Sequence, residues 1–249
     1  LHAAAASMAN FVYIVGDEVS KECVLIDCAW DVSGVNAVVE GLGFKKIKGA
    51  VYTHYHFDHS GGQMPRGMSR GETVLVEGAQ TLHEQAVPIY ACEKDCSQIE
   101  RQCKLKKGSV SGMKDNEVLT FGGHELKFLH TPGHTPGSSC LLVDNEVLFT
   151  GDTLFIGACG RCDLPDSNVK ELYESFQRLK GLDDNVVVLA GHNYAEPAFS
   201  FIGNEKQNNP IMRAASEQAF RQMVAPGLTT SDAANHTSLS LSTTFDNNG

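Results

Sequence analysis

The chain has 249 residues, 42% of them hydrophobic, so it can bury a sizeable core in what we expect to be one large domain. Its formal net charge of −10 argues against nucleic acid or an anionic membrane as a partner, because either would call for a basic patch. No apolar stretch approaches the roughly twenty residues that span a bilayer. With no secretory leader in view, the eight cysteines favour free thiols in a reducing compartment. We therefore expect a cytoplasmic location, with the mitochondrion as the alternative.

The first part of the chain predicts a strand pair and a helix. Residues 1–9 are interpreted as a leader or an expression remnant, since the chain starts at Leu rather than Met. The apolar runs 11–15 and 23–27 flank a Gly-Asp turn and predict paired strands. Residues 31–41 predict a helix, with Asp31 as its N-cap and a glycine at its end.

The sequence Thr-His-Tyr-His-Phe-Asp-His follows a predicted strand at 47–53 and is the most informative motif of the chain. In an extended chain, side chains at i and i+2 point the same way, so His54 and His56 can hold one metal ion together. Asp58 and His59 come after the strand ends and point elsewhere, which suggests a pair of metals. Imidazole and carboxylate without thiolate favour zinc, iron or manganese in an open catalytic site. The alternative is a histidine-rich surface loop.

The remaining elements predict an α/β (α+β) fold. Strands at 74–76 and 89–90 and a helix near 93–104 are followed by a second group of strands, and residues 168–179 have helical spacing. That second group lies at 118–120, 125–129, 139–143 and 146–149. Two groups of strands with helices between them predict two sheets packed face to face, with the helices outside. From residue 226 the chain is polar and predicts a disordered tail, which leaves 10–225 as the catalytic domain.

Three later residues of ligand type each follow an apolar, strand-like run. His134 lies in a Gly/Pro-rich turn, whereas Asp152 and His192 each follow a glycine at the end of a run. Alone, each would more often be a turn residue. Because loops on a rigid scaffold often carry catalytic groups, we expect the strand ends to bring these residues to the histidine motif.

In this order and at these spacings, the motifs resemble those of the metallo-β-lactamase superfamily over about residues 10–215. The resemblance implies a four-layer αββα sandwich with two divalent metal ions, zinc being favoured and iron or manganese being alternatives. The first ion would be held by His54, His56, His134 and Asp152. The second would be held by Asp58, His59, His192 and the shared Asp152.

The metal pair predicts hydrolysis. A hydroxide that bridges two cations has its pKa pulled toward neutrality, and the same cations can polarise a carbonyl oxygen. Asp58 can hold the attacking hydroxide and accept its proton, so it is the predicted catalytic residue. No Ser or Cys nucleophile with an adjacent base is evident. Ester, thioester or amide hydrolysis is therefore expected.

Within the superfamily the chain is most similar to glyoxalase II, the hydroxyacylglutathione hydrolases. Shared motifs include Thr-Pro-Gly-His-Thr-Pro-Gly, Phe-Thr-Gly-Asp-Thr-Leu-Phe, Cys-Gly-Arg and Gly-His-Asn-Tyr. The resemblance implies a small-molecule thioester substrate, glutathione-derived or related, that contacts Arg161 and Tyr194. Cys162-Asp163 replaces the aromatic pair of the long enzymes, and a basic C-terminal extension is not evident. Both departures put glutathione specificity in question.

The main rival comes from another reaction class. Persulfide dioxygenases share the fold and these ligand types, use one iron on the equivalents of His56, His134 and Asp152, and resemble this chain at Gly-Arg-x-Asp (160–163). An inactive scaffold is disfavoured by the intact ligand set, and β-lactamase activity by the thioesterase-type loops. The motif Thr-Gly-Asp-Thr-Leu-Phe favours the hydrolase.

Overall fold

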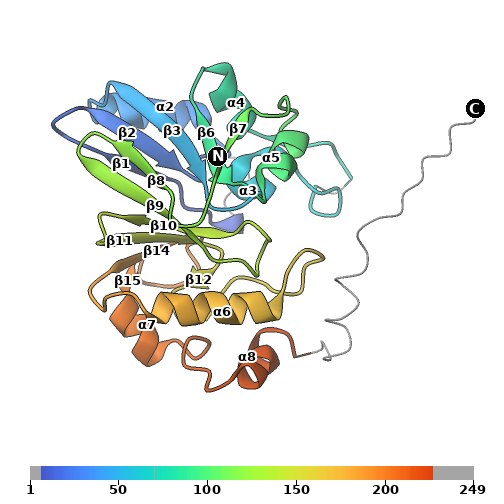
Figure 1. Ribbon diagram of the computed structural model, residues 1–249. Helices are drawn as coiled ribbons and strands as arrows, with labels where there is room; N and C mark the ends of the chain where they lie inside the picture. Colours follow the sequence, from blue (N-terminus) through green and yellow to red (C-terminus); the bar gives the residue numbers. More distant parts are fainter. Residues whose placement is uncertain (1–6, 70, 227–249) are drawn as a thin grey trace, which may run out of the picture.

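The protein is described by a computed structural model over residues 7–69 and 71–226, and two large sheets form its centre (Figure 1). The sheets pack face to face and carry helices on their outer sides, as the strand grouping predicts. The predicted α/β sandwich is therefore confirmed. Residues 1–6 of the proposed leader and 227–249 of the proposed tail lie outside the described residues, and the domain boundaries at 10 and 225 stay a prediction.

The N-terminal sheet has the strand order β1-β2-β3-β6-β7. Its strands are β1 (Tyr13–Gly16), β2 (Glu22–Ile26), β3 (Lys46–Tyr52), β6 (Ile89–Cys92) and β7 (Val110–Met113). The β1–β2 pair is antiparallel, and the other neighbours are parallel. Its outer face packs against helices α2 (Val32–Gly41), α4 (Ala79–Glu84) and α5 (Cys96–Gln102) in one apolar cluster.

The C-terminal sheet has the strand order β15-β14-β11-β10-β9-β8. Its strands are β8 (Val118–Phe121), β9 (His124–His130), β10 (Ser139–Val143), β11 (Val147–Gly151), β14 (Val187–Ala190) and β15 (Ser200–Phe201). Helices α6 (Val169–Lys180), α7 (Ile202–Asn208) and α8 (Glu217–Val224) lie on its outer side (Figure 1). The predicted apolar face of α6 faces this sheet, since Leu172, Phe176 and Leu179 are fully buried.

A third apolar cluster fills the space between the two sheets. Val24, Ile26 and Val51 of the N-terminal sheet pack against residues of the C-terminal sheet such as Phe128 and Leu141. Burying these large side chains from both sheets stabilises the sandwich, at about 1.5–3 kcal/mol for each fully buried side chain. The sheets therefore hold the ends of their strands at a fixed separation.

The predicted N-cap of α2 is confirmed, and two further local features fix the ends of other elements. Asp31 caps α2, where its carboxylate accepts a hydrogen bond from the backbone of Gly34 at 2.8 Å. Asn168 caps α6 in the same way. The loop 144–146 between β10 and β11 has positive φ at Asp144 and Asn145, and the N–H of Glu146 donates to the carbonyl of Val143 at 2.9 Å to close the turn.

Other predictions differ from the structure. The predicted strand at 74–76 is the short β5 (Leu75–Val76), which pairs only with β4 (Gly62–Gln63) outside the large sheets. The helix expected near 93–104 is the shorter α5. Sequence reasoning also missed the hairpin β12–β13 (Leu154–Phe155 and Ala158–Cys159). Over the described ranges, no helix is long and apolar enough to cross a membrane.

Candidate metal centre

The seven predicted ligand residues gather where strands from both sheets end. His54 and His56 follow β3, and the short helix α3 (Phe57–Ser60) begins directly after them and carries Asp58 and His59. The other three come from the C-terminal sheet, after β9, β11 and β14: His134, Asp152 and His192. The structure thus brings together every ligand that the sequence predicts.

The first cluster consists of His54, His56 and His134. The Nδ1 atom of His56 lies 3.0 Å from Nε2 of His54 and 3.0 Å from Nε2 of His134. Together these three nitrogens can face one metal ion, and all lie within 4.8 Å of one another. His54 and His56 therefore act as a pair, as their i, i+2 spacing predicts.

The second cluster consists of Asp58, His59 and His192. Nε2 of His59 lies 3.1 Å from Nε2 of His192 and 3.3 Å from Oδ2 of Asp58. The remaining pair, Nε2 of His192 and Oδ2 of Asp58, is 3.5 Å apart. All three side chains are buried.

Asp152 lies between the two clusters and gives one carboxylate oxygen to each. Its Oδ1 lies 3.3 Å from Nε2 of both His59 and His192, whereas its Oδ2 lies 3.4 Å from Nε2 of His134. Oδ1 is buried and has no hydrogen-bond partner among the described residues. A buried carboxylate oxygen without a partner is costly, and a cation would satisfy it. The donor set of imidazole nitrogens and carboxylate oxygens fits a divalent metal.

A second layer of residues orients His54 and His59. Oδ2 of Asp27 lies 3.0 Å from Nδ1 of His59 and accepts a hydrogen bond from the Thr53 hydroxyl at 2.7 Å. Because that hydroxyl donates its only hydrogen to Asp27, it accepts at 3.1 Å from Nδ1 of His54. Both rings therefore carry a hydrogen on Nδ1 and turn Nε2 toward the clusters.

Backbone carbonyls orient the rings of His134 and His192 in the same way. Nδ1 of His134 lies 2.8 Å from the carbonyl oxygen of Arg161, and Nδ1 of His192 lies 2.7 Å from that of Met8. A carbonyl can only accept, so both rings also carry their hydrogen on Nδ1. Sequence reasoning missed both contacts, because a backbone carbonyl leaves no signal in the residue type.

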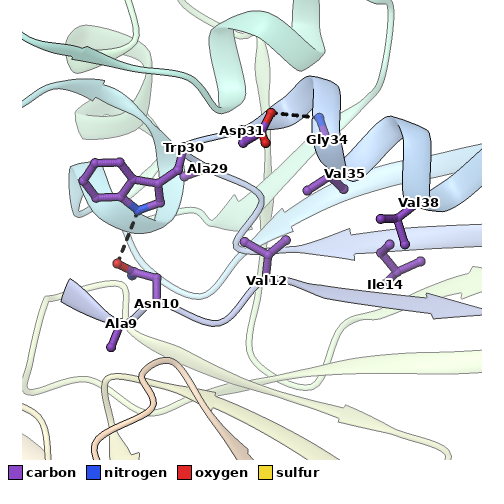
Figure 2. A pocket seen from close by; sticks show the side chains of 10 residues that line it. All are labelled: Ala9, Asn10, Val12, Ile14, Ala29, Trp30, Asp31, Gly34, Val35 and Val38. Carbon is purple, nitrogen blue, oxygen red and sulfur yellow. Dashed lines mark hydrogen bonds between the residues drawn. The ribbon is translucent and has the colours of Figure 1, made fainter. Parts of the chain in front are cut away.

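Asn10 contacts the second cluster and was also missed. Its Nδ2 donates to Oδ2 of Asp58 at 3.0 Å, and its Oδ1 accepts from the indole of Trp30 at 3.3 Å. Figure 2 shows this bond at the edge of a largely apolar cavity of about 470 Å³, between β1 and α2. Because the indole can only donate, the amide oxygen faces Trp30 and the amide nitrogen faces Asp58.

Burial and neighbouring charges set the ionisation of the clusters. Burial, reinforced by His134, lowers the pKa of His56 to about 4, and burial lowers the pKa of His54 well below its usual value. Burial alone would raise the pKa of Asp58, but His59 and Asn10 outweigh it and hold that pKa at about 2. Burial alone would lower the pKa of His59, but Asp58, Asp152 and Asp27 raise it well above its usual value, so a cation that binds there would displace a proton.

The two predicted substrate residues line one cavity of about 310 Å³ that also reaches His192. The Tyr194 ring stacks on that imidazole, with centroids 4.7 Å apart, and is 59% exposed, so it is not a core tyrosine. The Arg161 side chain is 69% exposed, and its Nε and Nη2 each lie 2.9 Å from a carboxylate oxygen of Asp163. Both residues are therefore placed to meet a ligand beside the second cluster.

Known proteins resemble this chain along most of its length. A probable polyketide biosynthesis zinc-dependent hydrolase, PksB of Bacillus subtilis, is 27% identical over 212 residues, which are 85% of each chain. The structure of TTHA1623 in a di-iron-bound form has 26% identity and a TM-score of 0.60, and covers 82% of this chain and 95% of its own. ETHE1 from Myxococcus xanthus has a TM-score of 0.71 and covers 92% of both chains. At 24% identity, that last likeness shows the fold alone.

The family model of the metallo-beta-lactamase superfamily matches residues 7–64 and 105–192. These segments contain every member of the two clusters and Asp152 between them. With its sandwich of two sheets and its ligand residues at the strand ends, the chain belongs to the metallo-beta-lactamase superfamily.

Proposed function

We propose that this protein is a metal-dependent thioesterase of the glyoxalase II type, which hydrolyses a hydroxyacyl-glutathione or a related thioester. The observation that carries the proposal is the placement of Asp152, whose two oxygens are divided between two complete clusters. The printed name of the PksB relative, a zinc-dependent hydrolase, supports the same reaction class.

The proposed cofactors are two divalent ions, with zinc favoured and iron or manganese as alternatives. The di-iron form of TTHA1623 supports a pair of ions in such a site. His54, His56 and His134 would hold the first, Asp58, His59 and His192 the second, and Asp152 both. When bound, such cations lower the pKa of coordinated water toward neutrality and polarise a carbonyl oxygen.

Asp58 is the proposed catalytic residue. Its Oδ2 faces the second cluster and is oriented by the amide of Asn10. With a pKa of about 2 the carboxylate is ionised at neutral pH, so its oxygen can accept a hydrogen bond from the attacking water and orient it. Burial of His59 and His192 keeps bulk water away from this position.

The cavity beside His192 is the proposed place for the thiol part of the substrate. Tyr194 covers one side of the imidazole, and Phe155 contacts both rings edge-on, with centroids 5.7 Å from His192 and 5.3 Å from Tyr194. Their apolar faces suit the methylene groups next to a thioester sulfur. The exposed guanidinium of Arg161 lies on the same cavity and can meet a substrate carboxylate.

The test is an anaerobic assay with S-lactoylglutathione on protein of known metal content. Thioester cleavage with one thiol released per turnover, in protein with close to two metals per chain, is the expected result. Chelation should abolish it, and zinc should restore it. Oxygen uptake with glutathione persulfide by a one-iron protein, together with no thioester cleavage under any metal loading, would instead establish the dioxygenase.

A further inference from the structure

Asp95 has a buried carboxylate that does not serve the helix it precedes. It occupies the N-cap position of α5, where an aspartate ordinarily accepts a hydrogen bond from the first turn, yet its side chain makes no such bond. The residue is only 1% exposed. Because burying a carboxylate is costly, its contacts elsewhere must explain the arrangement.

Those contacts join the two loops that supply the first cluster. Oδ2 of Asp95 accepts from the backbone N–H of Tyr55 at 3.0 Å and from the Thr135 hydroxyl at 2.8 Å. Tyr55 lies between His54 and His56, which follow a strand of the N-terminal sheet. Thr135 follows His134, in a loop of the C-terminal sheet. One oxygen atom thus connects both halves of the cluster.

The other oxygen is placed at some cost. Oδ1 makes no hydrogen bond of good geometry among the described residues, although the backbone of Gly137 lies close enough to lower the pKa of the carboxyl, and a Cβ atom at Gly137 would clash with this oxygen. The glycine therefore allows the carboxylate to reach both loops. An unsatisfied, buried oxygen is expected where the other oxygen serves a function.

We propose that Asp95 is a positioning residue that holds the loop of His54 and His56 at a fixed distance from the loop of His134, and so sets the affinity of the first cluster for its metal ion. Metal–ligand distances tolerate errors of only about 0.2 Å, so a small shift between the sheets would weaken binding. A single backbone bond, from the N–H of Ser139 to the carbonyl of Thr53 at 2.9 Å, helps to join the same loops. This proposal depends on the proposed function in one respect, that a metal cation binds to the first cluster.

The second cluster provides the internal comparison, because none of its members contacts Asp95. Asp58 and His59 lie on α3 and are fixed by Asn10 and Asp27, and His192 is fixed by a backbone carbonyl. Loss of Asp95 should therefore weaken metal binding at the first cluster selectively. A general loss of folding would weaken both.

The experiment is a titration of metal-free protein with Co²⁺, followed by its visible absorption. In a His192→Ala variant the second cluster lacks one of its members, so the titration measures the Co²⁺ affinity of the first cluster. In a His134→Ala variant it measures the affinity of the second cluster. Asp95→Ala should lower the Co²⁺ affinity of the first cluster by roughly 10–100-fold, the usual effect of losing an outer partner of a metal ligand, and leave the second unchanged. Asp95→Asn keeps an acceptor oxygen for Tyr55 and Thr135, so its affinity should lie between those of Asp95→Ala and the unchanged protein.

Glu100 is the matched control. It lies on the same helix, is 8% exposed, and accepts from the backbone N–H groups of Gly108 and Val110 at 2.6 and 3.2 Å, away from both clusters. Glu100→Ala should lower stability and leave both affinities unchanged. If Asp95→Ala does not fold, Thr135→Val removes the hydroxyl that donates to Asp95 and should lower the Co²⁺ affinity of the first cluster. Thr135→Ser keeps that hydroxyl and should keep the affinity of the unchanged protein. The proposal would be overturned if folded Asp95→Ala or Thr135→Val kept the full Co²⁺ affinity of the first cluster, or if Glu100→Ala lowered that affinity equally. This outcome does not depend on the result of the thioesterase assay.

Discussion

The two clusters of ligand-type residues differ in what holds their side chains in place. The first is joined across the sandwich by a side chain, through the carboxylate of Asp95. The second depends on the backbone that precedes β1: the carbonyl of Met8 orients His192, and the N–H of Asn193 donates to the carbonyl of Ala9 at 2.8 Å. Apart from Asp27 and Thr53, which together contact one ring of each cluster, the two clusters are thus positioned by separate structural elements.

The carboxylates behind the clusters also differ in how well they are satisfied. Asp27 accepts from the Thr53 backbone at 2.8 Å through one oxygen, and contacts the Thr53 hydroxyl and His59 through the other. Asp95 leaves one oxygen without a hydrogen bond of good geometry. The ionised carboxylate of Asp95 should therefore lower the free energy of unfolding.

Asp152→Ala should have the largest effect, because it removes an oxygen from both clusters at once. We expect loss of both metals and a fall in thioester hydrolysis of more than about 100-fold, since even outer partners of metal ligands contribute roughly 10–100-fold. Elemental analysis and the anaerobic thioester assay on the same preparation measure both effects. Full activity and metal content in this variant would disprove the dinuclear site.

The next effect concerns stability and pH. Burial raises the pKa of Asp95 from 3.8 to about 6, so between about pH 4 and pH 6 the folded state binds a proton that the unfolded state has lost. The free energy of unfolding should therefore fall as the pH rises through this window, by up to about 3 kcal/mol from this group. Asp95→Asn should lack this contribution. Urea unfolding of both metal-free proteins from pH 4.5 to 7 measures it, and parallel curves would contradict it.

Asn10→Ala should affect only the second cluster. It removes the hydrogen bond to Oδ2 of Asp58, and we expect the Co²⁺ affinity of that cluster to fall by about tenfold, the low end for an outer partner. Trp30→Phe is the control, since it removes the bond on the far side of the same amide. An equal loss at both clusters would show that the N-terminal segment supports the whole site rather than one half.

The sequence predicted that the seven residues of ligand type lie together, because they follow strands whose apolar pattern is clear. His134, Asp152 and His192 could be placed together because strand ends in packed sheets converge. The contacts behind them could not be predicted. Met8 and Arg161 act through carbonyl oxygens, and Asp95 meets Thr135 forty residues along the chain, so neither leaves a local pattern. The short strand β5 was also misplaced, because two residues carry too little periodicity to show their partner.

Arg161→Ala should have the smallest effect. It distinguishes the role of the Arg161 side chain from the role of its backbone carbonyl. The carbonyl oxygen of Arg161 orients His134, and a change of side chain leaves that contact in place. The metal content should therefore stay the same. The guanidinium is exposed and already paired with Asp163, so its contact with an anionic thioester should be worth less than about 1 kcal/mol, or a rise in KM of less than about fivefold.

Asp163→Asn is the complementary test. It removes the carboxylate charge that pairs with the Arg161 guanidinium and leaves the Arg161 carbonyl in place. It should lower KM for S-lactoylglutathione, while Arg161→Ala raises it, and neither variant should change KM for an uncharged thioester with the same acyl group. Steady-state kinetics with the two substrates, together with metal analysis of each variant, measure these shifts. Unaltered kinetics in both variants would assign Arg161 to the support of the first cluster alone, through its carbonyl contact with His134.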